Sequence, residues 1–435
     1  MTSTLKSLGL ETPAQRAWAL YDWGNSAFAT TMMAAILPIY FHDVAAVNLP
    51  EHERSAYWGY TAALSLFIVA VISPLLGAFA DVGGYKKKLL SSFTLLGAAA
   101  TVGFWWVGRG DYLMAATLYL VGNIGFAGAM VFYDALLPSV AAPADLHRVS
   151  SAGYALGYLG GGILLALNLL LINNYEFFSL PDKGTAVRVC FVSVAFWWIA
   201  FMVPLIRRIP EPGAPSSRQN VLVTVRMTLR RLRETVDKVK MYPQVWLFLL
   251  SFWFYSDGIG TIIKMATTYG REVGIGANHL IGALLLVQFV GIPATFAFGK
   301  LADRLGPKGS LQICISVYAC ICVIGYFMTE AIHFWILSIL VALVQGGSQA
   351  ISRSLYASLV PQDQLSEFFA FMSVSSRFAG ILGPFLFGVT SQWAGGSQLS
   401  LLLLVSFFII GGGVLVFVDV EAGQRAAQGQ TLNNA

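Results

Sequence analysis

Residues 77–88 read GAFADVGGYKKK, and the same pattern returns at residues 299–309 as GKLADRLGPKG. Both stretches follow the order Gly, three residues, Asp, two residues, Gly, one residue, Lys. Each lies between two long apolar segments, and the Asp and second Gly of the second copy come 222 residues after those of the first. A pattern that repeats at a fixed offset predicts an internal duplication.

Two further matches lie at nearly the same offset. Residues 133–138 (YDALLP) correspond to residues 356–361 (YASLVP), 223 residues later. A pair of glycines recurs at the same offset: Gly157 corresponds to Gly380, and Gly160 corresponds to Gly383. Together these matches indicate two halves of one architecture along the chain.

The composition places the chain in a membrane. Hydrophobic residues make up 57% of the sequence and charged residues 11%, and the mean hydropathy is +0.68. Apolar runs of about 20 residues can cross the bilayer core as helices. The sequence therefore predicts an all-α polytopic membrane protein with twelve transmembrane helices in two pseudo-symmetric six-helix halves. The predicted spans are residues 17–41, 57–80, 89–108, 112–140, 151–173, 188–208, 244–269, 279–299, 310–329, 331–356, 367–391 and 399–419.

The distribution of positive charge predicts the topology. With a cytoplasmic N-terminus, 20 of the 27 Lys and Arg residues fall on cytoplasmic segments and five on external loops. The positive-inside rule then places both termini in the cytoplasm. The expected division is an N-terminal six-helix half at 1–208, a cytoplasmic linker at 209–243, a C-terminal six-helix half at 244–420 and a disordered cytoplasmic tail at 421–435.

A basic amphipathic helix is expected at residues 218–241 of the linker. Apolar residues recur there at steps of three and four, from Leu222 to Val239, while Arg226 and Arg230 occupy other faces. Such a helix is suited to lie on anionic lipid headgroups at the cytoplasmic surface. Binding of a partner protein is the alternative.

Polar side chains inside the predicted spans mark a candidate transport pathway. Charged and amide groups are costly in hydrocarbon, so we expect them to face a cavity or a partner. Most of them recur at helical spacing on the first helix of each successive triplet, and nested three-helix repeats would bring those helices around one central cavity. The alternative is that these groups only hold helices together. The pathway candidates are Asp22, Asn25, Asn123, Asp134, Asp257, Thr261, Lys264, Gln345, Gln349, Arg353 and Arg377.

Two of the carboxyl groups are candidate proton carriers. Asp22 and Asp257 lie within predicted spans, where a carboxyl group can bind and release a coupling proton. Arg377 is a candidate partner of Asp257.

Aromatic residues crowd the same regions. They could enclose the apolar part of a substrate, and the alternative is that they only pack against neighbouring helices or lipid. The pocket candidates are Tyr21, Trp23, Tyr133 and Tyr255.

The sequence lacks the motifs that are typical of several other classes of protein. No Gly-x-x-x-x-Gly-Lys-Ser/Thr phosphate loop occurs, which disfavours ATP-driven transport. Neither His-Glu-x-x-His nor Gly-x-Ser-x-Gly occurs, and all four cysteines lie in apolar segments, where packing is expected rather than metal binding. The sequence predicts no enzyme, no cofactor, no metal site and no nucleic-acid partner.

The twelve spans and the duplicated loop resemble the major facilitator superfamily over the whole chain. More narrowly, four stretches are similar to its vacuole-effluxer-like branch: 19–28 (ALYDWGNSAF), 132–138 (FYDALLP), 153–162 (GYALGYLGGG) and 256–258 (SDG). Fungal members of that branch are associated with the release of amino acids from the vacuole during autophagy. A compact chain with no Asn-x-Ser/Thr site resembles the bacterial members, which implies a place in the cytoplasmic (inner) membrane.

The resemblance also implies a cytoplasmic gate. In the superfamily, the acidic residue of the repeated loop ties the two halves together on the cytoplasmic side. Val82 and Tyr85 stand where basic residues are usual, and Pro307 interrupts the second copy, so the gate could be weaker or wired differently. The implied gate residues are Gly77, Asp81, Gly84, Lys86, Lys87, Gly299, Asp303, Gly306 and Lys308.

These features predict a monomeric secondary transporter of a small organic solute that works by alternating access, with protons as a candidate coupling ion. The resemblance implies an amino acid as the substrate. One alternative is an exporter of amphipathic drugs or metabolites. Another is a membrane sensor that kept the fold and binds a ligand without transporting it.

Overall fold

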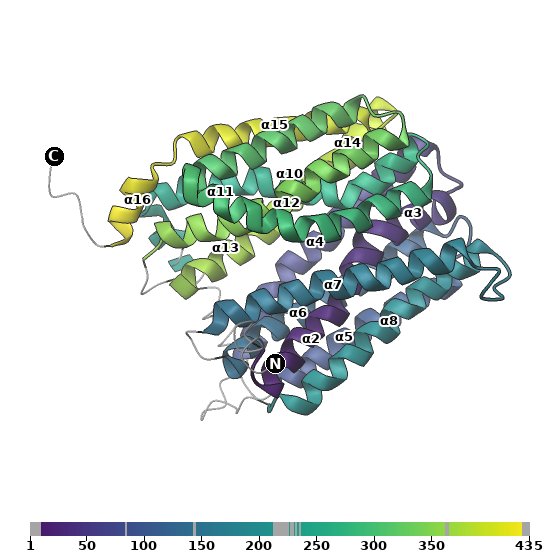
Figure 1. Cartoon of the computed structure of the whole chain (residues 1–435), viewed down its shortest axis with the longest axis horizontal. Coiled ribbons are helices and arrows are strands. Elements are labelled where there is room, and N and C mark those ends of the chain that lie inside the picture. The colour runs from purple at the N-terminus through teal and green to yellow at the C-terminus, as the bar shows by residue number, and fades with distance from the viewer. Residues whose placement is uncertain are drawn as a thin grey trace. The chain divides into compact units, whose positions relative to one another are not determined.

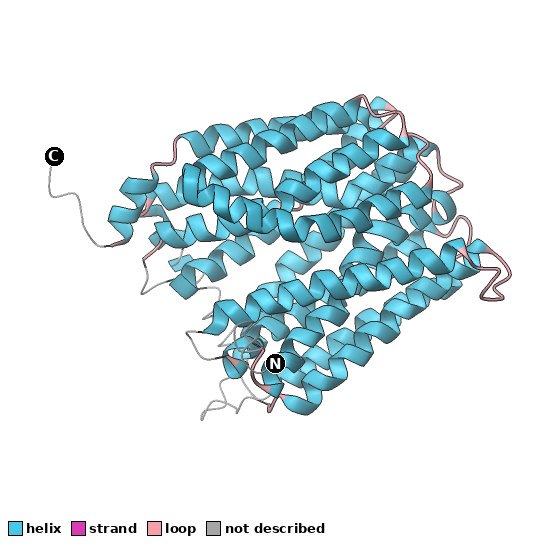
Figure 2. Cartoon of the chain, in the orientation of Figure 1, coloured by secondary structure: helices cyan, strands magenta, loops and turns pink. Residues whose placement is uncertain are grey.

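A computed structural model describes residues 10–82, 85–141, 145–211, 226, 230, 233–234, 236–361 and 365–428. The described chain consists of helices and short connections, with no strand in these ranges (Figures 1 and 2). Eleven of its helices are long and apolar enough to cross a membrane. The expectation of an all-α polytopic membrane protein is confirmed.

The N-terminal part of the chain contains ten elements, shown from purple to teal in Figure 1. They are α2 (Pro13–Ala27), η1 (Phe28–Ala35), α3 (Ile36–Tyr40), η2 (Phe41–Ala45), α4 (Glu51–Val82), α5 (Lys86–Gly103), η3 (Phe104–Trp106), α6 (Tyr112–Val140), α7 (Leu146–Asn173) and α8 (Lys183–Arg208). The C-terminal part contains α10 (Pro243–Glu272), α11 (Ala277–Tyr326), α12 (Ala331–Leu359), α13 (Leu365–Ala379), α14 (Leu382–Ala394), α15 (Gln398–Val416) and α16 (Val420–Ala427).

The first span begins at a capping box and does not remain a regular α-helix. The Thr12 hydroxyl accepts a hydrogen bond from the Gln15 N–H, and the Gln15 side chain accepts one from the Thr12 N–H. Pro13 then occupies the first helical position, where its missing N–H costs nothing. Beyond α2, both η1 and η2 are π-helical. Each π segment changes which side chains share a face, and such segments are frequent at functional sites.

The chain forms two compact units. The first comprises residues 1–54, 71–225 and 280–289. Within it, α5 packs on α6, and α2 packs on both α7 and α8. Glycines allow the closest approach: a Cβ at Gly125 of α6 would lie 2.5 Å from the Gly97 nitrogen of α5. Small residues at such contacts permit the van der Waals packing on which membrane helices depend.

The second unit comprises residues 55–70, 226–279 and 290–435. Its centre is the pairing of α10 with α15. The Ser251 hydroxyl donates to the Gly411 carbonyl across this pair at 2.6 Å. A Cβ at Gly411 would lie 3.0 Å from the Tyr255 nitrogen, so this pair also depends on a small residue. In this grouping the segments 55–70 and 280–289 each belong with the other part of the chain, and the expected division into halves at 1–208 and 244–420 remains a prediction.

One predicted span contains a break, and one long helix joins two predicted spans through a kink. The span expected at 367–391 consists of two short helices, α13 and α14, separated at Gly380 and Ile381, which is why it is absent from the eleven long helices. In α11, Gly306 has φ +76° and ψ 159°, a backbone conformation that glycine adopts without a steric penalty. Pro307 follows, and α11 is therefore two helices joined at a kink.

The tail beyond the last span is partly helical. Disorder was expected from residue 421, but that expectation is wrong for α16. The Asp419 carboxylate caps this helix by accepting from the Ala422 N–H at 2.9 Å, and Gly423 packs against Leu359 of α12. The end of the tail, at 429–435, and most of the amphipathic helix expected at 218–241 lie outside the described residues.

Candidate functional site

The carboxylate of Asp257 holds the start of a neighbouring helix. Asp257 lies in α10 and is only 3% exposed. The Gly383 N–H, in the first turn of α14, donates to its Oδ2 at 2.7 Å. The first N–H groups of a helix have no partner inside the helix and carry partial positive charge, so a carboxylate at this place is stabilised. Asp257 therefore acts as an N-terminal cap for α14.

A hydroxyl and a glycine complete this contact. The Thr261 hydroxyl donates to the Asp257 carbonyl at 2.8 Å and lies 3.5 Å from Oδ1 of the same residue. A Cβ at Gly383 would collide with the Thr261 hydroxyl and would lie 2.7 Å from the Asp257 Oδ1. Only glycine leaves room at this position for the carboxylate to reach the backbone.

The first unit contains a similar arrangement with one difference. Asp22 of α2 is 6% exposed, and the Ser26 hydroxyl, four residues later, donates to it over 3.4 Å. A Cβ at Gly157 of α7 would lie 2.6 Å from the Ser26 oxygen and 3.2 Å from the Asp22 Cγ. Both pairs thus consist of an Asp and a hydroxyl one turn apart that face a glycine. However, α7 is continuous here, so it offers Asp22 no free N–H of a helix start.

The surroundings of Asp22 add negative charge. Asp134 of α6 acts on Asp22 electrostatically as a like charge, and the Asp134 side chain is exposed. Tyr133 of α6 also interacts with both carboxyl groups. The two amide candidates are buried: the Asn25 side chain donates to the Met130 sulfur at 3.0 Å, and Asn123 is 3% exposed. The Asn25 Oδ1 has no partner among the described residues.

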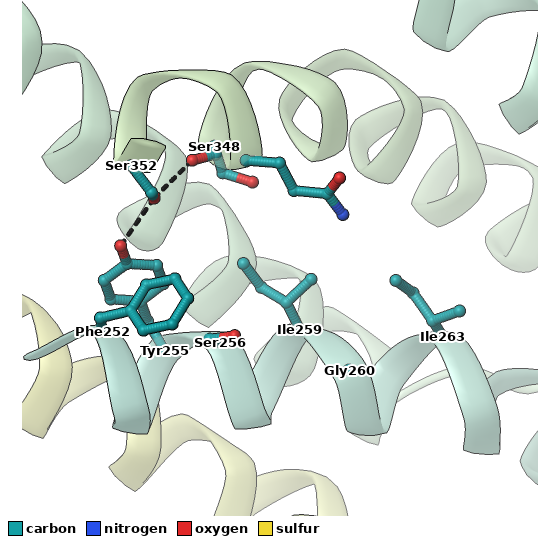
Figure 3. Close-up of a pocket in the computed structure, with 9 residues that line it drawn as sticks. Phe252, Tyr255, Ser256, Ile259, Gly260, Ile263, Ser348 and Ser352 are labelled. Carbon is teal, nitrogen blue, oxygen red and sulfur yellow. Dashed lines mark hydrogen bonds between the residues drawn. The ribbon is translucent and has the colours of Figure 1, made fainter. Parts of the chain in front are cut away.

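A small pocket with a mainly apolar lining and a few polar groups lies between α10 and α12 in the second unit. Its volume is about 160 Å³. Figure 3 shows the side chains of Tyr255, Ile259 and Ile263 on the side of α10 that faces Ser348 and Ser352 of α12. The lining residues are Phe252, Tyr255, Ser256, Ile259, Gly260, Ile263, Ser348, Gln349 and Ser352.

The hydroxyl groups in this pocket form a short chain. The Ser352 hydroxyl donates to the Ser348 carbonyl at 2.5 Å. Because its single hydrogen is used there, the Tyr255 hydroxyl is the donor in the 2.6 Å contact with the Ser352 oxygen (Figure 3). The Phe252 ring stands at 90° to the Tyr255 ring, with centroids 5.5 Å apart. This wall presents aromatic surface together with satisfied hydroxyl groups.

Tyr255 and Gln349 were expected in a pathway, and the structure brings them together in this pocket. The other lining residues were missed. On α10 the signal was available, since the lining residues of that helix recur at steps of three and four along one face. On α12, two serines four residues apart alternate with Gln345, Gln349 and Arg353, which were singled out for their larger polar groups.

Lys264 lies beside Gly260, one of the residues that line the pocket. Its side chain is half-buried, and its Nζ donates to the carbonyl of Gly260, a lining residue, at 3.1 Å. The ammonium group lies over Gly260, since it is 3.2 Å from the place where a Cβ would stand. The backbone carbonyl of Lys264 accepts from the Trp58 indole at 3.0 Å, which fixes this part of α10.

The remaining polar candidates occupy less enclosed positions. Gln345 is half-buried, and its carbonyl accepts from the Ser348 hydroxyl at 2.8 Å. Arg353 is exposed on α12, and Arg377 is half-buried in the last turn of α13. The Gly383 N–H and the Thr261 hydroxyl contact the Asp257 carboxylate, instead of the partner expected in Arg377.

Three of the four aromatic candidates pack inside the first unit. The Tyr21 hydroxyl pairs with that of Thr94 at 2.8 Å and accepts from the Trp198 indole at 3.2 Å. Tyr133 stacks on the ring of Trp18, with centroids 4.2 Å apart and planes 10° apart. The third, Trp23, lies against the rings of Trp197 and Phe201. These contacts favour a packing role, and of the four only Tyr255 lines the pocket described above.

The lysines of the duplicated loop bind the ends of other helices. The Lys87 ammonium donates to the carbonyl of Ile209, the C-cap of α8, at 2.6 Å. The Lys308 ammonium donates to the carbonyls of Val416 and Val418, at the end of α15, at 2.8 and 2.7 Å. Lys86 donates to the Ala135 carbonyl of α6 at 3.3 Å.

A cation at a helix C-terminus is favourable, because the last carbonyls lack partners and carry partial negative charge. Each of these lysine contacts lies within one unit. The side chains of Asp81 and Asp303, and the surroundings of Gly77 and Gly299, are not described, and Gly84 lies outside the described residues. The gate expected from the resemblance therefore remains a prediction.

Comparison with known proteins agrees with this fold and these spans. A family profile described as "Vacuole effluxer Atg22 like" matches residues 47–428. The chain is 37% identical over 421 residues to the uncharacterized MFS-type transporter YxiO of Bacillus subtilis, covering 96% of this chain and 98% of that protein. It is 24% identical over 443 residues to autophagy-related protein 22-1 of Phaeosphaeria nodorum, covering 86% and 78%.

The fold is shared with solved transporters. The D-xylose-proton symporter superposes with a TM-score of 0.67 at 14% identity, covering 96% of this chain and 99% of that one. At this identity the likeness concerns the fold alone, and the family assignment rests on the profile and on the bacterial relative. The chain is a multi-pass membrane protein that belongs to the vacuole effluxer Atg22-like family of major facilitator transporters, which are secondary transporters and not enzymes.

Proposed function

We propose that this transporter moves a small amino acid or a closely related organic solute across the cytoplasmic membrane by alternating access. The observation that carries the proposal is the pocket between α10 and α12, where Tyr255, Ser352 and Gln349 line a small space within membrane-spanning helices. The pocket combines a mainly apolar lining with a few hydroxyl and amide groups, which is the usual composition of a small-molecule site and favours solute binding. The amino acid is suggested by the fungal relatives of the family.

The test is counterflow in proteoliposomes. Vesicles with the purified protein are preloaded with unlabelled amino acids, and entry of a radiolabelled pool is followed with and without an inward proton gradient. Saturable counterflow supports the proposal, and stimulation of net uptake by the gradient adds proton coupling. Absence of flux in folded, inserted protein, with binding retained, would instead favour the membrane sensor.

If transport is coupled to protons, Asp22 is the better carrier of the two candidate carboxylates. Asp257 is engaged at 2.7 Å by a backbone N–H that cannot move away without disturbing α14. Asp22 has a single long hydrogen bond from Ser26, and its charged neighbour Asp134 is of the same sign. Binding of a proton relieves both the burial of charge and the like-charge repulsion at Asp22.

The second candidate function is export of amphipathic compounds, which the aromatic wall made by Phe252 and Tyr255 favours. The same vesicles distinguish the two, because an amphipathic exporter would accept hydrophobic cations and ignore amino acids. For the rest of the molecule, we propose a monomer with both termini in the cytoplasm. We also propose that the six-helix halves at 1–208 and 244–420 are the moving parts and that the 218–241 segment lies on anionic lipid.

A further inference from the structure

We propose that Lys264 binds the carboxylate of the transported solute at the edge of the α10–α12 pocket, and that the solute is recognised through this negative charge and not through an amino group. This inference rests on the proposed transport function and names the group by which the substrate is held.

The first step concerns the free bonding capacity of the ammonium group. A lysine ammonium has three N–H donors. In the described part of the chain, the Lys264 Nζ makes one hydrogen bond, to the Gly260 carbonyl, and no carboxylate lies within ion-pair distance of it. Asp257, seven residues earlier on the same helix, acts electrostatically on Lys264 but lies beyond ion-pair distance, and its carboxylate is held by the Gly383 N–H. A half-buried cation with unused donors is well suited to an anionic ligand.

The second step concerns where the ammonium points. Helical side chains lean toward the N-terminus of their helix, which carries the Lys264 ammonium back over Gly260. Gly260 lines the pocket, and its lack of a side chain leaves the space that the ammonium occupies. The charge therefore lies beside Gly260, a lining residue that is more than one helical turn from Phe252 and Tyr255 on the same helix.

The third step concerns size and charge. Five residues separate Gly260 from Tyr255, which is about 7.5 Å along a helix axis. That length suits a carboxylate at Lys264 with a short carbon chain or a single ring beside Ile259 and Phe252. None of the residues that line the pocket is acidic, so the pocket itself offers a substrate amino group only hydroxyl and amide oxygens. Recognition should then follow the carboxylate.

Three matched probes test this inference: phenylalanine, phenylalaninamide and 3-phenylpropionate. They share the ring and differ in whether they carry a carboxylate and an ammonium group. Each is added to the purified full-length protein, and the shift in Tm is measured over a range of concentrations. We expect phenylalanine and 3-phenylpropionate to raise the Tm and phenylalaninamide to leave it unchanged.

Lys264→Met should weaken binding of both carboxylates by roughly 10- to 100-fold, as expected for loss of a hydrogen bond to a charged group. Lys264→Arg, which keeps the positive charge, should retain most of the affinity for both carboxylates. Lys183→Met, which removes an exposed lysine from the first unit, is the matched control and should leave the shifts unchanged. The Arg variant and the control separate loss of the charge from loss of the fold.

The inference is overturned if phenylalaninamide stabilises the protein as well as phenylalanine does, if the shifts survive Lys264→Met, or if none of the three probes shifts the Tm. Counterflow measured in parallel separates this failure from failure of transport. Amino-acid flux that persists with the same carboxylate preference in Lys264→Met would remove the role of Lys264 and leave the transport function standing. Carboxylate binding that depends on Lys264, without any flux, would support the role of Lys264 and contradict the transport function.

Discussion

The Asp257 carboxylate and the Gly383 N–H lie 2.7 Å apart and join α10 to the start of α14. This contact gives a buried acidic side chain a structural partner at the point where a membrane-spanning segment is interrupted. It also makes the glycine a sensitive position, because a Cβ there would meet the Asp257 and Thr261 oxygens.

Gly383→Ala should destabilise the protein by about 1–3 kcal/mol, since the added methyl group overpacks a filled contact. The measurement is thermal unfolding of the purified protein in detergent. Gly413→Ala in α15 is the matched control, because no atom lies within 4 Å of its added Cβ. The control should be unchanged or more stable by up to about 1 kcal/mol. Equal losses in both variants would show that the α10–α14 contact is not specific.

The hydrogen bond that Asp257 accepts can be tested separately from its negative charge. Asp257→Asn keeps an oxygen that can accept from the Gly383 N–H and loses only the favourable charge at the helix start, which costs about 0.3–1 kcal/mol. Asp257→Leu leaves that N–H buried without a partner and should cost about 1–3 kcal/mol. The comparison of the two Tm values is the measurement. An Asn variant as unstable as the Leu variant would argue against the cap.

The bounds of the long helices were predictable, and the break in α13–α14 was not. The span expected at 112–140 coincides with α6, because a continuous apolar stretch with polar ends defines a membrane helix by itself. The stretch 367–391 is also largely apolar, and its hydropathy gives no sign of the break at Gly380. The interruption is stabilised by Asp257, more than 120 residues away in the sequence, and a local pattern carries no such contact.

The candidate site was predictable for residues whose polarity is costly in a membrane. Asp22, Asp257 and Lys264 stood out for this reason. Ser348 and Ser352 did not, because a serine hydroxyl can donate its hydrogen bond to a carbonyl of its own helix, as Ser352 does to the Ser348 carbonyl. Their part in the pocket depends on the approach of Tyr255 from another helix.

The lysines of the duplicated loop should contribute to stability through helix ends. Lys308→Met removes the donors that reach the Val416 and Val418 carbonyls and should cost about 1–2 kcal/mol. Lys87→Met should have a similar effect through Ile209. Lys240→Met is the control, since Lys240 and its partner Asp237 are both exposed, and such surface pairs contribute little. Thermal unfolding of the three variants checks this, and an Lys308 variant as stable as the Lys240 variant would contradict it.

The two pseudo-equivalent carboxylates should differ in their effect on coupling. Asp22→Asn removes a proton-binding group that, among the described residues, accepts one long hydrogen bond from Ser26, whereas Asp257→Asn alters a group that holds the start of α14. In proteoliposomes, we therefore expect Asp22→Asn to abolish the stimulation of net uptake by an inward proton gradient while counterflow, which needs no net proton movement, continues. Asp257→Asn should keep the stimulation. Glu51→Gln, which removes an exposed carboxylate at the start of α4, is the control for a general loss of negative charge. Gradient stimulation that survives in Asp22→Asn and disappears in Asp257→Asn would reverse the assignment and make the α14 contact part of the coupling cycle.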